Sequence, residues 1–223
     1  MKKILLVVLL CLLAGCAKSK DFSYGLGQMD AVNSKYNITY SSYPADVNQI
    51  DVIINSYKGL KSLKLDTGRE AFDEFVDYQL LTFESDKQFV NGLKYGDAGT
   101  TKYGFGCKIR PLIIETVKFK NESATMGFEA ISKLKDFVDK YPQNSKLANL
   151  SQKDVIFLNA TFYELSKDAN SDSGTINSFC PEDVTLEIYR QQFRKETNFS
   201  KDYIDKMDYS TAVMEWKKIE GIE

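Results

Sequence analysis

The chain carries 29 basic and 31 acidic residues but no histidine, so any chemistry must come from other side chains. Histidine is the commonest general base near neutral pH and the commonest transition-metal ligand. Its absence excludes, within this chain, serine–histidine and cysteine–histidine nucleophiles, histidine zinc motifs and histidine-containing di-iron bundles. We therefore expect no catalytic residue, no metal site and no cofactor. An enzyme built from this sequence would have to use serine, lysine, tyrosine or carboxylates.

The carboxylates are numerous, but their spacing does not define a reactive pair. An acidic stripe, Glu70, Asp73, Glu74 and Asp77, recurs at helical steps. Calcium binding would need oxygen ligands that converge from a loop, so we interpret this stripe as the solvated face of a helix. The glycine-rich segment 95–106 likewise lacks the GxxxxGK[ST] pattern of a phosphate-binding loop.

The N-terminal residues have the pattern of an export signal. Two lysines precede an uninterrupted apolar run at 4–13. This run is shorter than the roughly 20 residues that a membrane-spanning helix needs, and it has the length of a signal-peptide core. The residues that follow, Leu13-Ala14-Gly15-Cys16, resemble the lipobox of bacterial and archaeal lipoproteins. That resemblance implies cleavage before Cys16 and a lipid on this cysteine.

The lipobox resemblance predicts an exported protein that is anchored to a membrane through its lipid. No aspartate follows Cys16, which by resemblance to lipoproteins of diderm bacteria favours the outer membrane. In a monoderm bacterium or an archaeon the same signal implies the outer face of the cell membrane. The alternatives are an ordinary cleaved secretory signal and a buried N-terminal helix.

The cysteines outside the signal divide into a lipid site and a pair. Cys11 lies within the signal and Cys16 is the expected lipid site, which leaves Cys107 and Cys180. Exported proteins meet oxidising conditions that favour disulfides, so we predict a Cys107–Cys180 bridge. The alternative is two separate buried thiols that behave as small apolar residues.

Three of the four arginines could form an anion-binding cluster if this bridge forms. Arg190 and Arg194 are one helical turn apart, and Arg110 follows Cys107 by three positions. A bridge to Cys180 would bring Arg110 toward the other two arginines, which could then bind an anion. The alternative is ordinary surface pairing with Glu182, Glu187 or Glu196.

Asn-x-Ser/Thr triplets are more frequent than the composition predicts by chance. They begin at Asn37, Asn121, Asn149, Asn159 and Asn198. This excess resembles the N-glycosylation of archaeal surface proteins. The alternative is chance combined with helix capping, since Ser151 and Ser200 are also expected N-caps. We expect Asn37 to be the most accessible of the five.

Helical periodicity dominates the chain after residue 45, and β-alternation of useful length is absent. We expect helices at about 46–59, 66–91, 107–140 (with a possible break at 120–123), 152–166, 181–197 and 200–216. The five glycines within 92–106 predict the main loop of the domain, and the polar segment 167–178 predicts turns.

The sequence therefore predicts an all-α protein with five to six antiparallel helices in a bundle. We expect a signal peptide at 1–15, a lipidated N-terminus and extended tether at 16–45, and a helical domain at 46–223. Segment 137–142 resembles the end of a tetratricopeptide repeat, but no second copy follows at the period of that repeat.

The expected function is binding rather than catalysis. The formal net charge is −2, and no basic patch with interleaved aromatic residues occurs, so nucleic acid is not an expected partner. We expect a membrane-anchored envelope lipoprotein that binds another envelope component through a groove between helices or through the glycine-aromatic loop. The alternatives are a histidine-independent enzyme and a lipoprotein that binds a small molecule or an anion.

Overall fold

A computed structural model describes residues 19–36, 43–104 and 106–222. Within these ranges the regular structure is entirely helical, with nine α-helices and one 3₁₀ helix, which confirms the all-α prediction. The α-helices are α2 (Phe22–Asn33), α3 (Tyr43–Leu60), α4 (Arg69–Tyr103), α5 (Arg110–Lys140), α6 (Pro142–Leu147), α7 (Gln152–Phe179), α8 (Glu182–Glu196), α9 (Lys201–Lys206) and α10 (Tyr209–Glu220), and the 3₁₀ helix is η1 (Cys107–Ile109).

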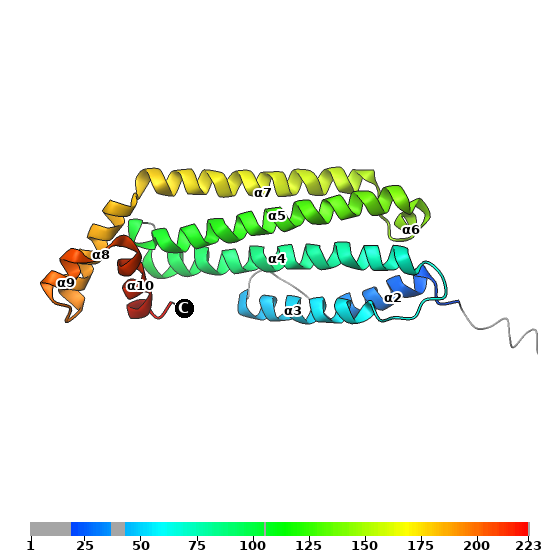
Figure 1. The fold of residues 1–223 in the computed structure, drawn as a ribbon, viewed down its shortest axis with the longest axis horizontal. Coiled ribbons are helices and arrows are strands. Elements are labelled where there is room, and N and C mark those ends of the chain that lie inside the picture. The colour runs from blue at the N-terminus through cyan, green and yellow to red at the C-terminus, as the bar shows by residue number, and fades with distance from the viewer. Residues whose placement is uncertain (1–18, 37–42, 105, 223) are drawn as a thin grey trace, which may run out of the picture.

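Three long antiparallel helices form a rod, and shorter helices sit at its two ends. Helix α5 packs against α4 on one side and α7 on the other, and α3 packs on the far side of α4 (Figure 1). Helices α2 and α6 lie at one end of the rod, whereas α8, α9 and α10 form a head at the other (Figure 1). With 35 residues, α4 spans about 50 Å at about 1.5 Å per residue.

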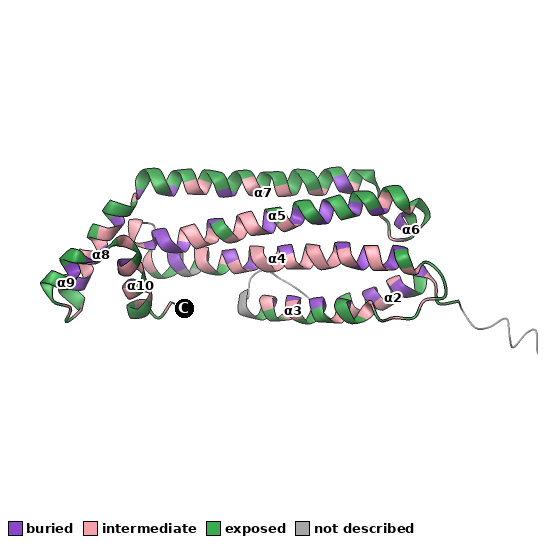
Figure 2. Ribbon diagram, in the orientation of Figure 1, coloured by how far each residue is buried: buried purple, intermediate pink, exposed green. Residues whose placement is uncertain are grey.

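Each end of the rod has its own apolar core. At the α2 end, Phe75 stacks on Phe137 with ring centroids 5.2 Å apart, and Phe22 lies 6.0 Å from the same ring. In the head, fully buried Trp216 stacks on Tyr189 at 5.2 Å. Between the two ends the buried residues follow the helix faces that meet along the rod (Figure 2). These cores fix the positions of the helices whose surfaces form the candidate site.

The main loop predicted at 92–106 is wrong for most of its length, because α4 continues to Tyr103. A Cβ at Gly92 would lie 3.1 Å from the Cβ of Phe119, and one at Gly99 would lie 3.1 Å from Leu112. These glycines therefore face α5 and allow the two helices to approach closely. Helix α4 is followed by Gly104, whose φ of 68° favours glycine, and η1 already begins at Cys107.

The extended tether predicted over 16–45 is wrong for 22–33, which form α2, and for 43–45, which form the start of α3. Phe22 is 2% exposed and Met29 is 4% exposed, so this helix belongs to the core. Asp21 caps it by accepting a hydrogen bond from the backbone N–H of Tyr24. The preceding residue is also fixed, since the backbone N–H of Lys20 donates to the Asp66 carboxylate at 2.8 Å. The predicted signal peptide and Cys16 lie outside the described residues.

Three other helix boundaries differ from the sequence prediction. Helix α7 runs through 167–178, because Ala169 and Ile176 remain buried on its inner face. Helix α5 is unbroken at 120–123, where Ser123 is buried and its carbonyl accepts a 2.8 Å hydrogen bond from Ser85. The predicted last helix divides into α9 and α10, since Asp208 caps a new start.

Candidate functional site

The predicted disulfide is present and joins the rod to the head. Cys107 in η1 bonds to Cys180, the residue that follows α7, with a Cα–Cα distance of 5.0 Å. It ties the start of α5 to the junction between α7 and α8. Since α8 begins two residues after Cys180, the bridge also fixes where the head leaves the rod.

Arg110 is buried beside this bridge and donates to groups of the chain itself. Its guanidinium donates to the Tyr209 hydroxyl at 2.7 Å and to the Asn177 side-chain oxygen at 2.8 Å. It also lies 3.5 Å from the Glu182 carboxylate, which is one of the surface pairs that the sequence allowed. Arg110 therefore connects α5 to α7, α8 and α10.

The other two predicted anion-binding arginines have different partners. Arg190 donates to the backbone carbonyl of Met207 at 2.7 Å, where α9 ends. Arg194 pairs with Asp205 at 2.7 Å and with Glu187 at 3.3 Å. Because each arginine donates to carboxylates or carbonyls of the chain, these contacts argue against a shared anion site and favour the surface-pairing alternative.

The predicted glycosylation residues occupy different environments. Asn149, Asn159 and Asn198 are exposed, whereas Asn121 is half-buried and precedes the buried Ser123 by two positions. Asn37 lies outside the described residues. A glycan on Asn121 would therefore meet more steric hindrance than one on the three exposed asparagines.

An acidic residue in the head is held in its ionised form by neighbouring donors. Burial alone would raise the pKa of Glu220, but hydrogen bonds from Tyr103, Lys108 and Lys102 outweigh it and lower this pKa to about 2. The Tyr103 hydroxyl lies 2.8 Å from the Glu220 carboxylate, and each lysine ammonium lies 3.2 Å away. This carboxylate therefore acts as an acceptor that ties α10 to α4 and η1.

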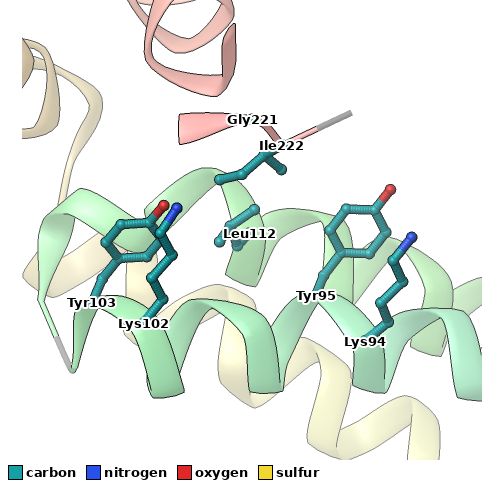
Figure 3. A pocket seen from close by; sticks show the side chains of 7 residues that line it. All are labelled: Lys94, Tyr95, Lys102, Tyr103, Leu112, Gly221 and Ile222. Carbon is teal, nitrogen blue, oxygen red and sulfur yellow. The ribbon is translucent and has the colours of Figure 1, made fainter. Parts of the chain in front are cut away.

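A slot of about 400 Å³ lies next to this carboxylate. Figure 3 shows Tyr95 and Tyr103 rising from α4 on either side of Leu112, with Ile222 above them. Lys94 and Lys102 stand beside the two tyrosines. Lys102 contacts Glu220, so the slot holds residues that already stabilise the C-terminal end of α10.

The largest candidate site is an apolar groove of about 630 Å³ between α4 and α7. Its floor is α5, which lies between these two helices (Figure 1). Its large apolar lining residues are Phe89 and Leu93 of α4 and Leu158, Phe162 and Leu165 of α7. Below, this site is called the α4–α7 groove.

The rim of the α4–α7 groove is mainly acidic. Asp86 stands on the α4 side, and Glu164 and Asp168 stand on the α7 side. The one basic lining residue, Lys120, forms a 2.7 Å ion pair with Asp172. The groove therefore combines an apolar interior with an edge of negative charge.

A glycine of α5 sets the position of one groove residue. A Cβ at Gly127 would lie 2.3 Å from the Phe162 ring, so the ring occupies the space that this glycine leaves. Sequence reasoning did not find the groove residues. The steps from Leu158 to Phe162 and Leu165 indicate an apolar face, but the pairing of helices decides which part of that face stays uncovered.

Neither a metal site nor a membrane-spanning helix occurs in the described part of the chain. No group of three or more cysteine, aspartate or glutamate residues there could hold a metal ion. The described helices also lack the combination of length and hydropathy needed to cross a bilayer. No protein-family model, curated protein or solved structure matches the chain.

Proposed function

We propose that this protein is a lipid-anchored component of the cell envelope whose α4–α7 groove binds a helix of another envelope protein. The observation that carries the proposal is the apolar groove of about 630 Å³, open between two long helices and floored by a third. A helix placed there would contact α4, α5 and α7 at once and bury their apolar lining.

The shape of the groove defines the length of the partner helix. Its lining residues run from Thr82 to Leu93 on α4 and from Leu158 to Asp168 on α7. Each stretch covers about 16 Å of helix at about 1.5 Å per residue, or three turns. The partner segment therefore needs about three turns with one apolar face.

The acidic rim defines the charge of that segment. Lysine or arginine beside its apolar face would oppose Asp86, Glu164 and Asp168. Acidic helices would place like charges against the same rim, and this would disfavour their binding.

The envelope location rests on the lipobox resemblance at Cys16. The Cys107–Cys180 disulfide supports the same location, because such bonds persist in oxidising compartments. Cys16 precedes Phe22, the first residue of α2, by six positions, and this separation limits how far the lipid can lie from the rod. Six residues span at most about 20 Å, so the lipid would hold the α2 end of the rod close to the membrane.

Site-specific photo-crosslinking in intact cells tests the groove. A benzophenone amino acid replaces Thr161, an exposed residue of the α7 rim, and in a control variant it replaces Ser178, which is exposed beyond the groove on the same helix. We expect the Thr161 variant alone to form a crosslink, and the attached peptide to be a helix with basic residues beside an apolar face. Equal crosslinking in the two variants, or attachment to an acidic or extended segment, would contradict the proposal.

A further inference from the structure

The first half of α7 is apolar on its outer face as well as its inner one. Ile156, Phe157 and Tyr163 are 69%, 71% and 61% exposed. On the inner face of the same turns, Val155 and Leu158 belong to the core at the α2 end of the rod. Large exposed apolar residues that gather on one face mark a surface that contacts something else.

The outer apolar residues form a stripe with a lysine at each end. Lys153, Ile156, Ala160, Tyr163 and Lys167 follow one another at steps of three or four residues, which places them on one face of the helix. Phe157 borders this line, and all six side chains are exposed. Lys167 lies 3.3 Å from Glu164, a weak surface pair that leaves most of its side chain in solvent. We call these six residues the α7 stripe.

The composition of the α7 stripe suits a lipid surface. An apolar centre with one phenylalanine and one tyrosine can enter the boundary between headgroups and acyl chains. Lysines at the edges can extend along the apolar surface and keep their ammonium groups among the phosphates. The stripe covers about 20 Å of helix from Lys153 to Lys167 at about 1.5 Å per residue.

The stripe begins at the end of the molecule from which the N-terminal segment leaves. Phe22, at the start of α2, belongs to the same core cluster as Val155 in the first turn of α7. The described chain begins three residues earlier, at Ser19, and the proposed lipid site is Cys16. A lipid at Cys16 would therefore hold this end of the rod, where the stripe begins, near the membrane. This proximity raises the effective concentration of the stripe at the lipid surface.

We propose that the α7 stripe lies against the lipid surface, so that the rod is oriented along the membrane. The proposal rests on the proposed lipid anchor. The α4–α7 groove adjoins the stripe on α7, since Phe157 precedes three groove residues, Thr161, Glu164 and Asp168, at steps of four, three and four residues. The groove would then face sideways, along the membrane surface, where a helix of another envelope protein could enter it.

Fluorescence quenching by brominated lipids tests this orientation. The full-length lipidated protein is reconstituted into vesicles of phosphatidylethanolamine and phosphatidylglycerol that carry bromine near the headgroup end of the acyl chains. Phe157→Trp places a probe in the stripe. Val52→Trp places a matched probe on α3, which lies at the opposite edge of the helix layer (Figure 1) and where Val52 is 46% exposed. The native Trp216 is fully buried in the head and serves as the internal reference.

We expect the Phe157→Trp emission to shift to shorter wavelength and to be quenched several-fold more than that of Val52→Trp. Equal quenching at the two positions, or none at either, would overturn the proposal. Protection of the Phe157→Trp probe together with a dimer in detergent would also overturn it, because a second copy would then cover the stripe. Mass spectrometry of the mature N-terminus reports the lipid on Cys16 separately, so a missing anchor is distinguishable from a stripe that does not touch lipid.

Discussion

Gly127 shows how one absent Cβ atom shapes the α4–α7 groove. A methyl group at this position would overlap the Phe162 ring, whose nearest atoms lie 2.3 Å from the ideal Cβ. We expect Gly127→Ala to lower the free energy of unfolding by about 1–3 kcal/mol, the usual cost of overpacking. Urea denaturation followed by circular dichroism measures the change.

Gly174 provides the matched control for that substitution. It lies within α7 with nothing within 4 Å of an added Cβ. Gly174→Ala should therefore raise the free energy of unfolding by about 0.5–1 kcal/mol through helix propensity alone. If both alanine variants were stabilised, the close contact between Gly127 and Phe162 would be contradicted.

Glu220 makes the stability of the head depend on pH. Its pKa of about 2 in the fold lies below the unfolded value of 4.5, so the ionised carboxylate stabilises the fold above that higher value. This contribution is lost as the pH falls from about 4.5 toward 2. Glu220→Gln should lose about 1.5–3 kcal/mol at neutral pH, the range for hydrogen bonds to a charged group.

The acid dependence identifies the source of that loss. We expect the unfolding free energy of the Glu220→Gln variant to fall less steeply than that of the original chain below about pH 4.5. Denaturant titrations at several pH values measure both slopes. Parallel slopes would show that Glu220 does not titrate with a lowered pKa.

Helix α2 is the element whose role changes most between sequence and structure. Phe22 packs against Phe72, Phe75 and Phe137, with ring centroids 6.3, 6.0 and 6.0 Å away. Phe22→Ala should therefore lower the free energy of unfolding by about 3–5 kcal/mol, as expected for an aromatic residue removed from a core. Thermal and urea unfolding give this value. If residues 22–33 formed a tether, Phe22→Ala would leave the free energy of unfolding unchanged. We expect that result for the control substitution Tyr24→Ala, because Tyr24 is 36% exposed.

The helical class of the chain could be predicted from its periodicity, whereas several helix limits could not. A glycine can end a helix, or it can lie within a helix and allow a second helix to pack closely. Gly92 and Gly99 are of the second kind because α5 packs against them, which the local sequence does not reveal. Residues 22–33 carry a signal that could have been used. Phe22, Leu26 and Met29 are spaced by four and three residues, with the small Gly25 beside them.

The candidate site was less predictable than the fold. The Cys107–Cys180 pair follows from counting cysteines, because pairing uses residue identity and compartment. The α4–α7 groove depends on three helices that are far apart in sequence, so local spacing could not reveal it. The continuation of α7 to Phe179 also depends on tertiary packing, since α5 covers its apolar positions within a polar segment.

At the scale of the whole molecule, the disulfide is a second covalent connection between rod and head, in addition to the main chain that runs from α7 into α8. It closes a loop with a sequence separation of 73 residues. We expect the double variant Cys107→Ser/Cys180→Ser to lose about 4 kcal/mol of unfolding free energy in the chain-entropy treatment. Hydrogen exchange should accelerate more in α8 and α10 than in α4, because the head is the part that the bridge holds.

Reduction provides the control for the disulfide prediction. Dithiothreitol should lower the denaturation midpoint of the original chain and leave that of the double variant unchanged. An original chain that unfolds at the same denaturant concentration with and without dithiothreitol would contradict the predicted contribution.

The order of the long helices along the rod has a consequence for how the chain folds. Helices α4, α5 and α7 each pack on the preceding long helix, beginning with α3, so most contacts join neighbouring segments. Such local topologies fold quickly, because little loop entropy is lost before contacts form. A chain that emerges N-terminus first can add one helix at a time to the growing edge. Phe22 acquires its full set of partners only when Phe137 arrives, and the bridge can close only after Cys180 has emerged.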